Sequence, residues 1–170
     1  MVSNYLSNYC AYYLSRYSVS KKKFENILKK KIKKDFFYKK INKIEYDKLS
    51  QEIKIVLKKY DKLGIFNEEE LIKSKISYFI KKGFSKKKII SYLEKEYFER
   101  EIVKKETNFI NCDMEFDTKQ IEKFVSKQNS SKFGNIEKIS KQNFDKILKK
   151  LLREGFKYSD CYNYLKKDKI

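Results

Sequence analysis

Two runs of lysine carry the clearest chemical signal in this chain of 170 residues. Each run follows a serine, first in Ser20-Lys21-Lys22-Lys23 and again in Ser85-Lys86-Lys87-Lys88. Serine is favoured immediately before a helix, so both runs are expected to fill the first turn of a helix. The helix dipole disfavours cations there, whereas backbone amides and ammonium groups together suit a phosphate oxygen. The two runs therefore predict phosphate binding at two helix starts.

Further basic residues lie close to these two helix starts, and another lies before a third tight turn between helices. The chain holds 42 Lys and Arg residues against 23 Asp and Glu residues, a net charge of +19. Such a charge is typical of a protein that binds a polyanion. The candidate nucleic-acid-binding or filament-binding residues are Arg16, Lys21, Lys22, Lys23, Lys81, Lys82, Lys86, Lys87, Lys88 and Arg153.

The composition also allows a plainer interpretation. Lysine accounts for 39 of the basic residues and arginine for 3, while alanine, proline and glycine are scarce. AT-rich codons encode this set of residues. Codon use explains lysine in place of arginine well, and a net charge of +19 less well. A structural interaction protein with a merely solvated lysine surface therefore stays open beside the polyanion-binding interpretation.

Catalytic chemistry has little support in the sequence. The chain has no histidine, which excludes Ser-His-Asp catalysis, Cys-His nucleophiles and histidine-containing zinc sites. Its four glycines do not form a phosphate-binding loop. Glu68-Glu69-Glu70 is expected to form the first turn of a helix. A polar loop that binds a metal weakly at most is expected at Asp113, Glu115 and Asp117. We expect no enzymatic activity, no catalytic residue and no cofactor or metal site.

The cysteines and the apolar segments suggest the cell compartment. Cys10, Cys112 and Cys161 are far apart and form no Cys-x-x-Cys pair, so buried free thiols in a reducing cytoplasm are expected. No apolar run approaches the roughly 18 residues that span a bilayer. The first twenty residues lack the basic region of a secretory signal. The prediction is a cytoplasmic protein with no membrane partner.

Apolar residues recur at helical spacing through almost the whole chain. The clearest stripe predicts a helix over 46–63 that ends at Gly64. Asn67 is expected to cap the next helix, which Gly83 ends, and Ser85 is expected to cap a shorter one.

Two later segments and the N-terminal segment also carry apolar residues at helical spacing. Helices are predicted over about 98–110, with Phe109 among the inward residues, and over about 118–128. No alternating segment of useful length competes, so the predicted fold class is all-α. The first helix carries five tyrosines whose expected role is core packing, although base stacking is an alternative: Tyr5, Tyr9, Tyr12, Tyr13 and Tyr17.

A unit of helix, tight corner and shorter helix occurs three times. The corner at Ser20 is echoed at Ser85, and Gly83-Phe84 is echoed at Gly155-Phe156. We predict three tandem three-helix modules over residues 1–45, 46–113 and 114–170, and whether the first module is complete stays open. Asn129–Gly134 is the one convincing flexible linker.

The order and spacing of these segments resemble the RecX family, regulatory proteins that modulate the RecA recombinase. The resemblance covers about residues 5–167. Family patterns such as L-x-x-L-x-x-x-G and R-x-x-x-G-x-x-x-I-x-x-x-L are similar to segments of this chain at Tyr12–Leu28, Leu57–Leu71, Lys82–Leu93 and Ile147–Tyr158. The chain departs from the family in three ways. Lysines stand where the family has arginines, Tyr97 stands where a corner glycine is common, and Glu68 replaces an aspartate.

This resemblance implies three tandem three-helix modules in an elongated, curved arrangement. It also implies binding along the groove of RecA–DNA filaments, which restrains filament growth and the RecA ATPase in recombination, DNA repair and the SOS response. The expected protein is thus a non-enzymatic, monomeric regulator that binds the RecA filament, and single-stranded DNA or another nucleic acid through its basic surface. A basic helical module that binds DNA or RNA directly, with no recombinase partner, is the alternative.

Overall fold

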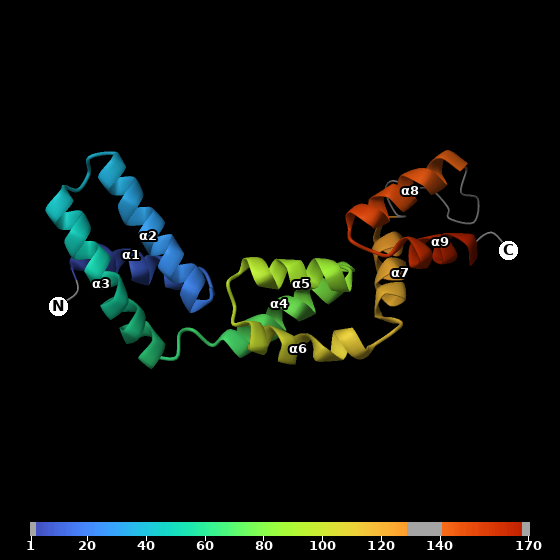
Figure 1. Cartoon of the computed structure of the whole chain (residues 1–170), viewed down its shortest axis with the longest axis horizontal. Coiled ribbons are helices and arrows are strands. Elements are labelled where there is room, and N and C mark those ends of the chain that lie inside the picture. The colour runs from blue at the N-terminus through green and yellow to red at the C-terminus, as the bar shows by residue number, and fades with distance from the viewer. Residues whose placement is uncertain (1–2, 129–140, 168–170) are drawn as a thin grey trace. The chain divides into compact units, whose positions relative to one another are not determined.

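The computed structural model describes residues 3–128 and 141–167, which form nine helices and no strand (Figure 1). The predicted all-α fold is therefore confirmed. None of these helices is both long and apolar enough to cross a membrane. In chain order they are α1 (Asn4–Leu14), α2 (Lys21–Phe37), α3 (Lys43–Lys62), α4 (Glu68–Lys82), α5 (Lys86–Lys95), α6 (Arg100–Cys112), α7 (Phe116–Gln128), α8 (Lys141–Arg153) and α9 (Tyr158–Lys167).

Side chains just before the helices satisfy backbone N–H groups that have no partner inside a helix. Asn42 and Glu45 form a capping box at α3: the Asn42 side chain accepts the Glu45 N–H at 2.9 Å, and the Glu45 carboxylate accepts the Asn42 N–H at 2.8 Å. Asn67 accepts the Glu70 N–H at 3.2 Å, which confirms the predicted cap of α4. Glu68-Glu69-Glu70 is the acidic first turn predicted there.

Residues with positive φ follow several helices. Gly64, at 69°, follows α3, and Gly83, at 78°, ends α4, as predicted. Lys39 and Tyr97 have φ values of 55° and 60° although neither is glycine. They follow α2 and α5, so each of these helices ends on a residue in the left-handed conformation that favours glycine.

The chain divides into two compact units. The first comprises Met1–Leu71 with Glu96–Glu99, and the second comprises Ile72–Lys95 with Arg100–Ile170. The three modules over 1–45, 46–113 and 114–170 remain a prediction. The structure places all of α3 in the first unit with α1 and α2. The predicted linker Asn129–Gly134 lies outside the described residues.

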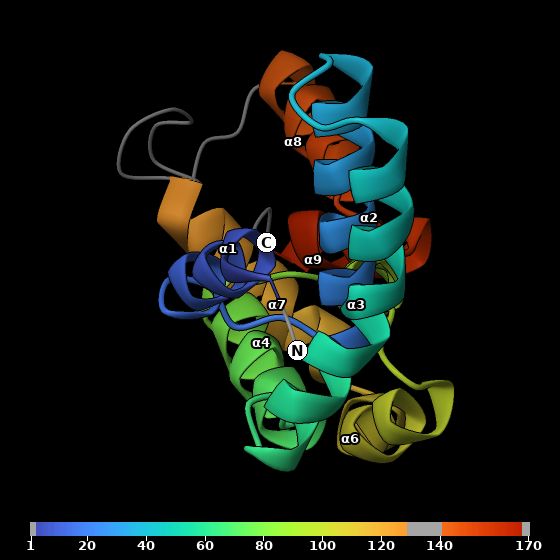
Figure 2. The same cartoon turned by 90° about the vertical axis from the view of Figure 1, so that its left-hand side faces the viewer.

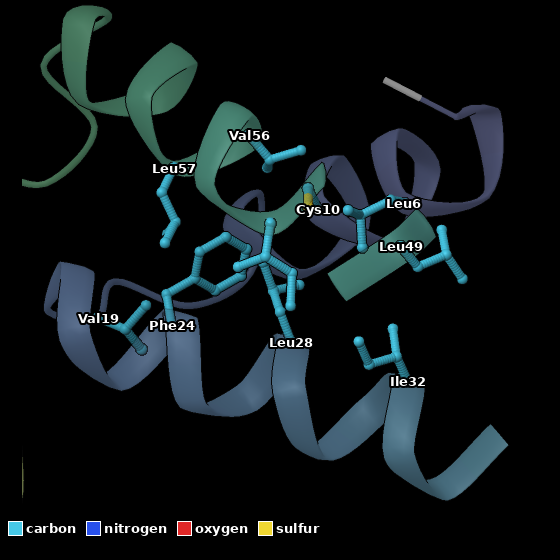
Figure 3. Close-up of a cluster of buried hydrophobic side chains, with 10 residues drawn as sticks. Leu6, Cys10, Val19, Phe24, Leu28, Ile32, Leu49, Val56 and Leu57 are labelled. Atoms are coloured by element: carbon cyan, nitrogen blue, oxygen red, sulfur yellow. The ribbon is translucent and has the colours of Figure 1, made fainter. Parts of the chain in front are cut away.

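The core of the first unit lies between α1, α2 and α3. Helices α2 and α3 run antiparallel and side by side, with α1 across them (Figures 1 and 2). Phe24 and Leu28 point from α2 toward Val56 and Leu57 on α3, and Cys10 closes the cluster from α1 (Figure 3). Full burial of such a side chain stabilises the fold by about 1.5–3 kcal/mol, so this stripe positions the start of α2.

The second unit buries apolar side chains of α7, α8 and α9 against one another. Helix α9 packs on both α7 and α8, while α5 packs on α6. The buried side chains of the cluster formed by α7 to α9 are Ile121, Phe124, Val125, Ile147, Leu151, Phe156, Cys161 and Leu165.

Several burial predictions are wrong for reasons of helix phase. Phe109 is exposed because Val103 and Ile110 define the buried face of α6 and residue 109 lies about 100° away from it. Cys112 is exposed for the same reason, whereas Cys10 is buried as predicted. The tyrosines divide: Tyr9 and Tyr13 pack on the core, but Tyr12 and Tyr17 are exposed, since Tyr12 is off the buried face and Tyr17 lies beyond the end of α1.

Candidate nucleic-acid interface

The first lysine run begins α2 and is tied to the segment that follows α5. The Ser20 hydroxyl accepts the Lys23 N–H at 3.2 Å and donates to the Glu96 carbonyl oxygen at 2.6 Å. The Lys23 ammonium lies 2.7 Å from both carboxylate oxygens of Glu96. Ser20 is fully buried, so loss of its hydroxyl would leave these groups without partners. One serine, one lysine and one glutamate thus fix the start of α2 within the first unit.

The second run begins α5 and makes the same contacts in the second unit. The buried Ser85 hydroxyl accepts the Lys88 N–H at 3.1 Å, which confirms the predicted cap, and donates to the Glu154 carbonyl oxygen at 2.7 Å. The Lys88 ammonium pairs with the Glu154 carboxylate and lies 4.0 Å from the centroid of the Phe84 ring. Lys88 is therefore engaged on two sides.

These contacts define the internal repeat differently from the sequence pattern. The sequence pairs Gly155 with Gly83, whereas the contacts pair Glu154-Gly155 with Glu96-Tyr97. In both cases the glutamate comes at the end of a helix, and the next residue has positive φ. We call the set Ser20, Lys23 and Glu96 the first corner, and the set Ser85, Lys88 and Glu154 the second corner.

The first lysine of each run also has a partner. The Lys21 ammonium lies 2.7 Å from the Asp61 carboxylate at the end of α3. Lys86 donates its backbone N–H to the Asp117 carboxylate at 2.8 Å and its ammonium to the Asp113 carbonyl oxygen. Four of the six run lysines are thus bound within their own unit, where they hold helices together.

The middle lysines differ from their neighbours. Lys22 and Lys87 are exposed, and neither has an ion-pair partner among the described residues. Of the predicted phosphate-binding lysines in the two runs, these two have free ammonium groups.

The second unit gathers several candidate residues around one hollow of about 340 Å³. Lys87 and Arg153, both predicted from the sequence, line it together with Tyr92 and Lys95, and the paired Lys88 lies at its wall. Tyr92 and Lys95 were not predicted. Tyr92 and Lys95 are three residues apart on α5 and are therefore neighbours on the helix surface, and this spacing is the signal that points to them. Exposed cations beside an exposed ring can hold a phosphate and its adjoining base.

The remaining predicted residues lie at separate places. The Arg16 guanidinium donates to the Tyr12 hydroxyl at 2.7 Å and lies 4.1 Å from the centroid of its ring. Lys82 lies 4.5 Å from the centroid of the Tyr78 ring, and the exposed Lys81 accepts the Lys127 ammonium on its carbonyl oxygen. Within each unit, cations and exposed rings therefore occur together.

A second surface that sequence reasoning missed lies at the turn between α2 and α3. Phe37 and Tyr38 are 78% and 59% exposed, although an aromatic ring is usually buried. Their ring centroids are 5.4 Å apart, and the exposed Lys39 and Lys40 follow directly. The run Lys33-Lys34-Asp35-Phe36-Phe37-Tyr38-Lys39-Lys40 contains this signal, since basic residues flank consecutive aromatic ones. We call Phe36, Phe37 and Tyr38 the aromatic tip.

Buried carboxylates of the first unit serve packing. Burial opposes ionisation of Asp35, but hydrogen bonds from Lys31 and Tyr5 outweigh it, so the Asp35 pKa lies below its usual value. Glu52 behaves alike: burial raises its pKa, and the Ser3 hydroxyl and N–H, at 2.7 and 3.0 Å, lower it further than burial raises it. Both carboxylates tie the start of the chain to α2 and α3.

Of the three residues predicted to form a polar loop, Asp113 and Glu115 lie between α6 and α7, whereas Asp117 lies in the first turn of α7, so the loop prediction is wrong for Asp117. Lys119 lies 3.5 Å from the Asp113 carboxylate and 3.4 Å from that of Glu115. Burial raises the pKa of Asp117, and the N–H of Lys86 partly offsets that effect. Across the described residues, no three Cys, Asp or Glu side chains are arranged to hold a metal ion.

The cysteines are free thiols in two different environments. Cys10 and Cys161 are buried, and burial raises the pKa of each thiol to about 11. Neither therefore has appreciable thiolate at neutral pH. Cys112 is exposed, so the expectation of three buried thiols is wrong for this residue.

Comparison of the chain with known protein families, with curated proteins and with solved structures gives no match. The resemblance to the RecX family therefore rests on the sequence segments alone.

Proposed function

We propose that this protein is a non-enzymatic regulator that binds RecA–DNA filaments and restrains their growth. The support begins with the positions of the resembling segments. The segment around Gly64 joins α3 to α4, the segment around Gly83 joins α4 to α5, and the segment around Gly155 joins α8 to α9. Each of these segments spans a connection between consecutive helices, so the resemblance concerns the order of the helices and the turns between them.

The observation that carries the proposal is the duplicated corner with its free middle lysine. A repeated unit that presents one cation per repeat suits a partner that is itself repetitive and anionic, and DNA in a filament has both properties. Lys22 and Lys87, with Arg153 and Lys95 beside Lys87, are the residues that would contact phosphates. We further propose that the protein acts as a monomer in the cytoplasm.

The direct test is the ATPase of RecA on single-stranded DNA, measured with this protein present at less than one copy per RecA. The proposal expects the rate to fall with added protein. The Lys22→Gln, Lys87→Gln double variant should inhibit less, while the matched Lys30→Gln, Lys123→Gln variant, which also removes one exposed helical charge from each unit, should inhibit as the unaltered protein does. An unchanged ATPase at equimolar protein would refute the proposal.

Direct binding of single-stranded nucleic acid, with no recombinase, is the second candidate. The aromatic tip favours it, because exposed rings beside exposed lysines form a surface on which bases stack. Each stacked base is worth about 1–3 kcal/mol, so Phe37→Ala with Tyr38→Ala should weaken binding of a single-stranded oligonucleotide at least about tenfold. Phe109→Ala, which removes a ring that is 57% exposed from α6, is the control. Equal affinity of all three proteins would exclude the aromatic tip as the binding surface, and absence of binding by the unaltered chain would exclude this function.

A further inference from the structure

The outer face of α3 carries a furrow of about 590 Å³. Two rows of side chains, each spaced four residues apart, line it: one row is Lys54, Lys58 and Lys62, and the other is Ile55, Lys59 and Leu63. The opposite face of α3 is buried in the core of the first unit. The furrow is therefore the exposed side of a helix that is already fixed in place.

The furrow has the geometry of a helix-packing groove. Rows of residues four apart form the ridges of a helix surface, and a second helix packs by laying its own ridge between two of them. Ile55 and Leu63, 52% and 63% exposed, supply apolar surface that the first unit leaves uncovered. Lysine stems extend such a surface while their ammonium groups stay at its edge.

The charge at the edge specifies the partner. Lys54, Lys58, Lys59 and Lys62 are all exposed, and none forms an ion pair within the described part of the chain. Lys59 and Lys62 lie in the last turn, where the helix dipole favours cations. Lys54 and Lys58 lie further from the end, so the dipole does not account for them.

We propose that this furrow binds an amphipathic helix of a partner protein, with an apolar ridge on the floor and Asp or Glu side chains against the lysines. A nucleic acid would satisfy the lysines but would leave Ile55 and Leu63 against phosphate and sugar, whereas an acidic amphipathic helix satisfies both. The furrow contains none of the residues assigned to filament or oligonucleotide binding, so this inference does not rest on the proposed function.

The test uses the full chain and a fluorescein-labelled synthetic peptide of about 15 residues, long enough to form helix on binding. Its apolar ridge is leucine at every fourth position, with glutamate on both sides, and a second peptide carries glutamine instead. Fluorescence anisotropy should show binding of the glutamate peptide that weakens with salt, and several-fold weaker binding of the glutamine peptide.

Two variants separate the floor from the edge. Ile55→Ser should weaken binding by about tenfold or more, because an isoleucine that is buried on binding is lost. Lys54→Gln with Lys58→Gln should weaken it about 3- to 10-fold, in line with two exposed ion pairs. Lys22→Gln with Lys87→Gln, which removes two exposed charges elsewhere, should have no effect. Ile55 is exposed, so the variant should keep its helical circular dichroism.

Absence of binding, or equal affinity of Ile55→Ser and the unaltered chain, would overturn the proposal. A competition experiment gives a second contradicting outcome. If a single-stranded oligonucleotide displaces the peptide from the Ile55→Ser variant and from the unaltered chain at the same concentration, the surface is purely electrostatic and the proposal is wrong.

Discussion

The two Ser-Lys-Lys-Lys corners make the same contacts, but a different residue type follows the glutamate in each. In each, a buried serine caps a helix and donates to a glutamate carbonyl oxygen, and the third lysine pairs with that glutamate. The residue after the glutamate differs: Tyr97 at the first corner and Gly155 at the second, both with positive φ. The contacts and the positive φ are therefore repeated, whereas the type of residue that adopts the positive φ differs between the corners.

Packing explains why only one of these two positions requires glycine. A Cβ atom on Gly155 would lie 3.0 Å from the buried Ser85 hydroxyl oxygen. Tyr97 at the first corner is exposed and carries its side chain in the same left-handed region. The positive φ of Gly155 and its closeness to Ser85 together make the second corner less tolerant of a side chain at this position than the first corner is.

The largest expected effect is at Gly155. Gly155→Ala should destabilise the protein by about 2–4 kcal/mol in urea unfolding, because left-handed strain adds to crowding of Ser85. Gly64→Ala is the control: its φ is also positive, but a Cβ atom there meets nothing within 4 Å, so the loss should be only about 1 kcal/mol. Equal losses would show that the close approach at the second corner has no energetic weight.

Removal of the serine hydroxyls tests whether the corners are equivalent. Ser20→Ala and Ser85→Ala should each cost about 1–3 kcal/mol, since each loses a helix cap and leaves a carbonyl oxygen without its donor. The measurement is urea unfolding of each single variant. A neutral result at either corner would mean that its contacts do not stabilise the fold and that the repeat is one of sequence only.

The ion pairs should contribute less. Glu96→Gln and Glu154→Gln should each cost about 0.5–1.5 kcal/mol, because the pairs are only partly shielded from solvent. A double-mutant cycle with Lys23→Gln or Lys88→Gln isolates the pairwise energy in urea unfolding. A coupling energy of zero at one corner and a measurable one at the other would show that the two corners are not energetically equivalent.

Tyr97→Gly should have the smallest effect and the opposite sign. Relief of positive φ at a non-glycine residue is worth about 1 kcal/mol, and the greater freedom of glycine in the unfolded chain offsets part of it. We expect a change in unfolding free energy between zero and about 1 kcal/mol in favour of the variant. A clear loss would show that the exposed tyrosine ring stabilises the first corner.

Local sequence was sufficient for the helices and insufficient for the corners. Caps at Asn67 and Ser85 and ends at Gly64 and Gly83 were predictable, because each depends on a few neighbouring residues. The partners of Lys23 and Lys88 were not, since Glu96 and Glu154 are distant in sequence.

The same limit applies to the candidate binding residues. Charge and spacing alone could not separate lysines that hold helices from those that face solvent. Six run lysines were predicted to meet phosphate, and the structure leaves Lys22 and Lys87 free for it. The aromatic tip was visible in sequence but had no positional repeat to mark it.

The central claim is that the outer lysines of each run bind within the fold while the middle lysine binds the partner's phosphates. The most direct measurement is the salt dependence of affinity for a single-stranded oligonucleotide, with the Lys22→Gln, Lys87→Gln variant beside the unaltered chain. Each phosphate contact on a single strand contributes about 0.7 to the slope of log K against log salt, so loss of two should flatten it by about 1.4. Lys54→Gln with Lys58→Gln, which removes the same charge from α3, should leave the slope unchanged. Equal slopes for all three proteins, or equal flattening in both variants, would contradict the claim.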